Sequence, residues 1–136
     1  MIVVDTNLIA YLCMEGPRTE SARQLHAADP EWLAPLLWRS EYLNVLTTMM
    51  KQRLLSMAQA EQSWDTARGI VLPVAAEPTG RAVLNIAAHQ GISAYDAQFV
   101  ALAQAYSVPM VTCDRALSRK CVGIAWLVDA YLDTAS

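Results

Sequence analysis

The sequence predicts an α/β fold, a three-layer α/β/α sandwich whose central parallel sheet of four to five strands is covered by helices on both faces. Short apolar, often β-branched runs alternate along the chain with longer segments whose apolar residues recur at helical spacing. This alternating order is typical of parallel sheets with helical crossovers. At 136 residues the chain has the usual length of one domain, and we expect a single domain over residues 1–136.

Short apolar runs bounded by proline, glycine or acidic residues predict the strands. The clearest is Ile2-Val3-Val4, which stops at Asp5-Thr6. In chain order the predicted strands are residues 2–4, 32–34, 70–75, 109–112 and 124–128.

Apolar residues spaced three and four apart predict the helices between these strands. Gly16-Pro17 separates the first two helices, Asp29-Pro30 ends the second, and Gly91 lies just after the fifth. In chain order the predicted helices are residues 6–13, 18–28, 36–51, 57–68, 79–89, 93–106 and a brief helix that starts at Asp114.

Composition excludes several classes of protein. The apolar runs are far shorter than the roughly 20 residues of a membrane span, and no basic stretch precedes an apolar one at the start, so we expect no membrane association and a cytoplasmic location. Three cysteines without a C-x-x-C pair argue against a disulfide framework or a zinc ribbon and are interpreted as core thiols. His26 and His89 are too few and too scattered for a soft-metal site and are interpreted as surface helix residues.

A net charge of −3 is unusual for a protein that binds nucleic acid. Four of the 13 acidic residues, however, are candidate metal ligands: Asp5, Glu41, Asp96 and Asp114. Without them, nine acidic residues face ten Lys and Arg, a balance of +1. Bound metal would therefore remove the apparent acidity.

Two of these acids follow predicted strands. Asp5 comes directly after residues 2–4, and Asp114 follows the apolar run at 109–112. The carboxyl ends of parallel strands form the crevice in which open sheets bind ligands. Each acid is equally suited to a plain structural role, because aspartate is a favoured N-cap of a helix.

The other two acids lie on apolar helix faces. Glu41 has mostly apolar neighbours one turn away, where an unpaired carboxylate is costly, and Arg39 faces elsewhere. Asp96 completes a possible capping box with Ser93, yet Phe99 and Val100 flank it at helical spacing. We interpret the four acids as one cradle for Mg²⁺ or Mn²⁺, because hard cations take oxygen ligands and activate water toward phosphodiesters.

Four short motifs resemble the successive motifs of the PIN-domain family, over essentially the whole chain. They are Val3-Val4-Asp5-Thr6-Asn7, Ser40-Glu41 with Asn44-Val45-Leu46, Ala94-Tyr95-Asp96-Ala97 and Val111-Thr112-Cys113-Asp114. The similarity to bacterial and archaeal PIN toxins of the VapC type implies a magnesium- or manganese-dependent endoribonuclease of a toxin–antitoxin pair. It also implies an RNA substrate, a cognate antitoxin protein and a homodimer.

The resemblance also implies roles for individual residues. Asp5, Glu41, Asp96 and Asp114 match the catalytic, metal-binding quartet, and Thr6, Asn7 and Thr112 match polar positions that support the metal. From position alone, the three basic residues beside Asp114 are candidates for contacts with the RNA backbone, although a solvated helix surface explains them equally well. These basic residues are Arg115, Arg119 and Lys120.

Several alternatives stay open at the level of sequence. A receiver or dehalogenase-like phosphoryl-transfer domain also places acids at strand ends, but the dehalogenase motif needs an acid where this chain has Asn7. A binding module on the same scaffold and a non-toxin PIN nuclease acting on structured nucleic acid, including DNA, are further alternatives. Apolar residues at 36–68, such as Met57 and Trp64, either pack the interior or form a partner groove, and the interior is favoured.

Overall fold

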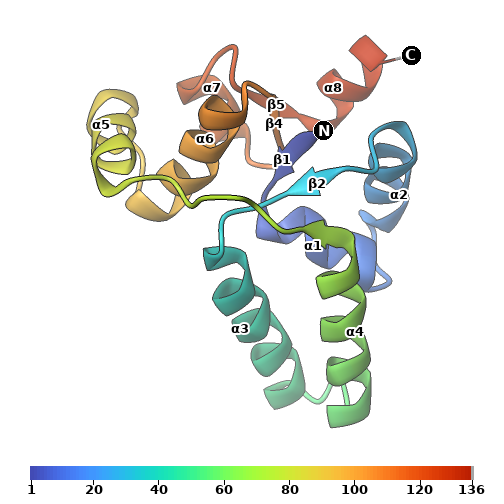
Figure 1. Ribbon diagram of the computed structural model, residues 1–136. Coiled ribbons are helices and arrows are strands. Elements are labelled where there is room, and N and C mark those ends of the chain that lie inside the picture. Colours follow the sequence, from blue (N-terminus) through green and yellow to red (C-terminus); the bar gives the residue numbers. More distant parts are fainter. Residues whose placement is uncertain (136) are drawn as a thin grey trace.

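The centre of the molecule is a sheet of five strands in which all neighbouring strands are parallel (Figure 1). The computed structural model describes residues 1–135. Their spatial order is β3-β2-β1-β4-β5, so β1 lies in the middle. The strands are β1 (Ile2–Val4), β2 (Trp32–Leu33), β3 (Val71–Leu72), β4 (Met110–Thr112) and β5 (Ala125–Leu127).

Helices cover both faces of this sheet, which confirms the predicted α/β sandwich. One group contains α1 to α4 together with α8, which packs on α2, and the other contains α5, α6 and α7. Figure 1 shows α3 and α4 side by side, extending away from the sheet. The helices are α1 (Thr6–Cys13), α2 (Thr19–Ala28), α3 (Leu37–Lys51), α4 (Met57–Ile70), α5 (Gly80–Gln90), α6 (Ala94–Tyr106), α7 (Arg115–Lys120) and α8 (Val128–Ala135).

The central strand is buried on both faces. All three residues of β1 have no exposed surface, as is typical of a parallel sheet between two helical layers. Val3 pairs with Leu33 of β2, and Val4 pairs with Val111 of β4. This register brings the carboxyl ends of β1 and β4 to the same edge of the sheet, so the residues that follow the two strands are neighbours.

Most predicted strands and helices differ from the structure by one or two residues at an end, and two predicted strands need further correction. The strand expected at residues 70–75 is only Val71–Leu72, because α4 continues through Ile70 and Pro73 has no N–H to donate to a sheet. The strand expected at 124–128 ends at Leu127, and Val128 begins α8, a helix that the sequence analysis missed. Within residues 1–135 no helix is both long enough and apolar enough to cross a membrane.

The apolar residues of the α3–α4 pair divide between interior and surface. Trp64 stacks on Trp38 at 5.5 Å between ring centroids and also contacts Tyr42, so for Trp64 the interior interpretation is confirmed. Met57, in contrast, is 60% exposed. The three cysteines are free thiols: Cys121 is buried, whereas Cys13 and Cys113 are only half-buried. The interpretation as core thiols is confirmed for Cys121, while Cys13 and Cys113 pack against the core from its edge.

Candidate active site

Four acidic side chains line one pocket of about 300 Å³. Asp5 follows β1, Glu41 lies on α3, Asp96 lies in the first turn of α6, and Asp114 follows β4. The pocket therefore opens at the carboxyl edge of the sheet beside its two central strands, where open α/β sheets bind ligands. The structure brings together the four carboxylates that the sequence analysis selected.

Asp5 is held in place from three sides. Its Oδ1 accepts the backbone N–H of Leu8 at 2.9 Å, which caps α1, and its Oδ2 accepts the hydroxyl of Thr112. The pKa of the Asp5 carboxyl lies above its usual value, mainly because the group is buried and also because of the charge of Asp114. Hydrogen bonds from Thr112, Leu8 and the Cys113 backbone oppose this shift but do not cancel it. The capping role and the pocket position thus coexist in one side chain.

Thr112 connects Asp5 to Asp114. The Thr112 side chain has no exposed surface, and while its hydroxyl donates to Asp5 its Oγ1 accepts the backbone N–H of Asp114 at 3.0 Å. Asp114 in turn accepts the backbone N–H of Leu117 at 3.0 Å and caps α7. One buried hydroxyl therefore fixes the relative position of two carboxylates from neighbouring strands.

Glu41 is positioned by Thr6. The hydroxyl of Thr6, which is buried at the start of α1, donates to Glu41 Oε1 at 2.7 Å. The Glu41 side chain is half-buried, in agreement with the expected inward-facing side of its helix. Asn7 lines the same pocket. The polar residues predicted to support a metal, Thr6, Asn7 and Thr112, therefore all lie in or directly behind the pocket wall.

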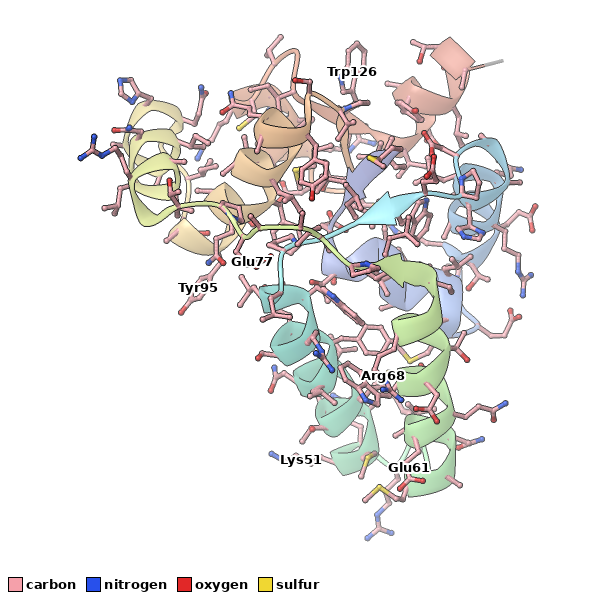
Figure 2. All side chains as sticks on the ribbon, in the orientation of Figure 1. Lys51, Glu61, Arg68, Glu77, Tyr95 and Trp126 are labelled. Atoms are coloured by element: carbon pink, nitrogen blue, oxygen red, sulfur yellow. The ribbon has the colours of Figure 1, made fainter. Side chains whose placement is uncertain are left out.

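Asp96 lines the pocket, and only half of the predicted capping box forms. Ser93 Oγ accepts the backbone N–H of Asp96 at 3.0 Å, but within residues 1–135 no reciprocal bond from the Ser93 backbone N–H to the carboxylate is present. Burial and the charge of Asp114 raise the pKa of Asp96, although Ser93 and Lys120 partly oppose that shift. Its neighbour Tyr95 projects away from α6 and is 63% exposed (Figure 2).

No basic side chain neutralises the pocket. Within residues 1–135 the ion pairs involve other acids, namely Asp29, Glu15 and Asp65. The charge of Lys120 acts on Asp96, but its Nζ donates to the carbonyl oxygen of Gly91 at 3.1 Å. Four carboxylates without an ion-pair partner leave an excess of negative charge that a cation would offset.

The donor chemistry of the pocket fits a hydrated hard cation. All four acids offer carboxylate oxygens, the ligands that Mg²⁺ and Mn²⁺ prefer. Within residues 1–135 no three His, Cys, Asp or Glu side chains form a ready-made coordination shell. Magnesium keeps several waters and commonly uses only one or two carboxylates directly, so a pocket with carboxylates on its walls suits it better than a closed cage.

The basic residues predicted from sequence do not gather at this pocket. Arg115, the first residue of α7, lines a different pocket. Lys120 is bound to Gly91, and Arg119 is exposed and lines neither pocket. Residues adjacent in sequence point in different directions here because α7 turns their side chains around its axis.

Asn44 also lines the pocket, although it was not among the site residues predicted from the sequence. Asn44 lies three residues after Glu41 on α3 and therefore shares its helix face. That spacing was visible in the sequence and is sufficient to identify it. Val45, Phe99 and Leu117 complete the apolar part of the wall.

The raised carboxyl pKa values predict how the metal-free protein responds to pH. A carboxyl whose folded pKa lies above its unfolded value binds more protons in the folded state, so folding stability falls as pH rises through the folded pKa. We expect Asp96→Asn to stabilise the metal-free protein at pH 7 by about 0.5–2 kcal/mol, the usual gain from relieving a costly functional group. The gain should disappear toward pH 3.

Urea unfolding in EDTA at pH 7 and at pH 3 measures the difference in free energy of unfolding between Asp96→Asn and the wild type. An equal difference at the two pH values would contradict this electrostatic origin.

The fold and the site can be compared with known proteins. The crystal structure of PAE2754 from Pyrobaculum aerophilum has a TM-score of 0.76 to this structure at 22% sequence identity, and the match covers 98% of this chain and 95% of that chain. At this level of identity the likeness shows the shared fold. No curated protein matches the chain.

The sequence itself carries a family signature. The family model of the PIN domain matches residues 2–123, a span that includes all four carboxylates of the pocket. PIN domains are generally nucleases and generally use divalent metal ions. Because the match covers most of the chain, the protein belongs to the PIN domain family.

Proposed function

We propose that this protein is a metal-dependent endoribonuclease that hydrolyses phosphodiester bonds of RNA and acts as a VapC-type toxin of a toxin–antitoxin pair. One observation carries the proposal: carboxylates from four separate segments line one pocket, and none has an ion-pair partner within residues 1–135. Such an arrangement is costly for folding, and perturbed carboxyls in a cleft are typical of functional sites. The toxin role, the antitoxin partner and the homodimer rest on the likeness of the four motifs to VapC-type toxins.

In this proposal the four carboxylates hold Mg²⁺ or Mn²⁺. The wall beside the sheet is formed by Asp5 and Asp114. Hydrogen bonds from Leu8 and Thr112 hold Asp5, and a hydrogen bond from Leu117 holds Asp114. The wall formed by helices carries Glu41 and Asp96, and Thr6 donates a hydrogen bond to Glu41. Bound there, the cation supplies Lewis-acid chemistry, activating water and offsetting charge that develops on the phosphate.

Two threonines, Thr6 and Thr112, hold carboxylates of the pocket in fixed orientations. Each hydroxyl of Thr6 and Thr112 donates to one carboxylate, which fixes the rotamer of an acid that would otherwise turn away from its like-charged neighbours. Burial, and after it the charge of Asp114, raises the pKa values of both Asp5 and Asp96, so each of these groups resists carrying its charge in the metal-free pocket. Metal binding must therefore displace protons, and we expect it to strengthen as pH rises.

A cleavage assay with two polymers tests the proposed substrate. The purified protein is incubated with end-labelled RNA and with single-stranded and hairpin DNA of matching sequence, in Mg²⁺, Mn²⁺ or EDTA. We expect internal cleavage of RNA with either metal, no cleavage in EDTA and intact DNA. Metal-dependent cleavage of DNA instead of RNA would favour a non-toxin PIN nuclease, and metal-independent binding without any cleavage would favour a binding module.

A further inference from the structure

A second pocket adjoins the acidic pocket at the same edge of the sheet. It has a volume of about 500 Å³. Two stretches of backbone form the wall between the pockets. In residues 5–8 the first three side chains line the acidic pocket and Leu8 lines the second. In residues 113–115, Asp114 lines the acidic pocket, whereas Cys113 and Arg115 line the second. A polymer that leaves the acidic pocket over this wall therefore enters the second pocket directly.

Two arginines gather at this shared wall. Arg115 is part of the wall itself, and Arg18, from the segment between α1 and α2, interacts with the side chain of Cys113. The Arg18 guanidinium also lies over the ring of Tyr11, 5.7 Å from its centroid, a contact that helps to fix its position. Within residues 1–135 neither arginine forms an ion pair with a carboxylate at 4.0 Å or less.

The opposite side of the second pocket has a different character. It is formed by α8 and the end of β5, which contribute the apolar residues Leu127 and Val128 and the acids Asp129 and Asp133. The charge of Asp129 acts on Arg18 from this side. The second pocket therefore has its two arginines at the wall that it shares with the acidic pocket and its carboxylates on α8. An anion is attracted to the arginines and repelled by the carboxylates.

We propose that Arg18 and Arg115 bind a backbone phosphate of the RNA next to the phosphodiester that is cleaved. This inference rests on the proposed function of the acidic pocket. Guanidinium groups form bidentate hydrogen bonds with phosphate oxygens, and such contacts set the position of a strand without reading its sequence. Such contacts would offset the repulsion between the RNA backbone and the carboxylates of the acidic pocket.

The arginines at this pocket differ in part from the basic residues predicted from sequence. Of the three basic residues beside Asp114, only Arg115 faces the second pocket, and its partner is the distant Arg18. Arg119 and Lys120 are left out of the contact, because neither lines this pocket. No sequence pattern indicates Arg18, since only the fold brings the segment between α1 and α2 beside residue 113.

Binding of labelled RNA tests this site separately from cleavage. Fluorescence anisotropy is measured with the Asp96→Asn protein in Mg²⁺, so that RNA cleavage is slow during the measurement, at several salt concentrations. Arg18→Ala and Arg115→Ala are added singly and together. We expect each to weaken binding about tenfold. We also expect each to lower the slope of log K against log salt by about one, since each removes one phosphate contact. Arg81→Ala on α5, exposed and absent from both pockets, is the matched control and should change neither quantity.

The outcomes separate the two proposals. Unchanged affinity and salt slope in the double variant would overturn the phosphate site, even if the wild-type protein cleaves RNA. Loss of affinity equal to that of Arg81→Ala would overturn it as well, because the effect would then reflect net charge alone. If the Arg18 and Arg115 variants lose affinity as expected but the wild-type protein never cleaves RNA, the phosphate site stands and the proposed nuclease activity fails.

Discussion

Asp96→Asn is expected to reduce kcat for RNA cleavage on the order of 10²–10³-fold, the size of effect seen when one preorganised electrostatic group is removed from an active site. The substitution keeps the size of the side chain and the N-cap bond from the Asp96 backbone to Ser93, but it removes one negative charge from the pocket. The protein should therefore stay folded and soluble. Single-turnover cleavage at saturating RNA and Mg²⁺ measures the loss, and circular dichroism checks the fold.

A matched variant separates the effect of the site from that of net charge. Asp65→Asn changes the charge of the chain by the same amount. Asp65 lies on α4 in an exposed ion pair with Arg68 (Figure 2), and it does not line the acidic pocket. Its activity should equal that of the wild type. In bacteria, induced expression of the wild type and of Asp65→Asn should stop growth, whereas Asp96→Asn should not. Equal RNA cleavage by Asp96→Asn and wild type would refute the catalytic assignment.

Chelation is expected to abolish cleavage completely. The pocket holds four carboxylates without an ion-pair partner within residues 1–135, so without a cation it repels the phosphates of the substrate. Activity should disappear in EDTA and return when Mg²⁺ or Mn²⁺ is added in excess. A chelated sample that keeps its activity would show that the carboxylates do not act through a metal.

The same cation should stabilise the folded protein. A ligand that binds only the folded state adds RT ln(1 + [L]/Kd) to the free energy of unfolding, about 2.7 kcal/mol at a hundredfold excess over Kd. The metal also offsets the negative charge that burial, and after it the charge of Asp114, makes costly at Asp5 and Asp96. Melting of the wild type with and without Mn²⁺ measures this gain, and Asp5→Asn, which retains an N-cap residue, should lose most of it.

Sequence was sufficient to identify the sheet and the acids because both depend on local signals. Buried parallel strands are continuous apolar runs, so Ile2–Val4 was predicted with the observed bounds. An acid that directly follows a parallel strand lies at the carboxyl edge of the sheet, where open sheets bind ligands. This rule predicted the positions of Asp5 and Asp114 in the acidic pocket. The PIN domain match then excludes the phosphoryl-transfer domains that share this rule.

Other features depend on contacts that no local pattern contains. Thr6 reaches Glu41 across 35 positions, and Thr112 reaches Asp5 across 107, so neither pairing follows from periodicity. Which pocket Arg115 lines depends on how α7 packs against β5. The missed α8 is a different case, because Val128, Tyr131 and Leu132 have helical spacing, but Val128 was assigned to the last predicted strand and the residues after it to no element.

The most direct measurement is calorimetric titration of Mn²⁺ into the metal-free protein and into variants that each lack one carboxylate: Asp5→Asn, Glu41→Gln, Asp96→Asn and Asp114→Asn. Our account predicts saturable binding to the wild type, weaker binding to every one of these variants, and wild-type binding to Asp65→Asn. Were the intact chain to take up no manganese, or were all four altered chains to bind it as tightly as the original, carboxylates brought together by this fold would not form a metal site.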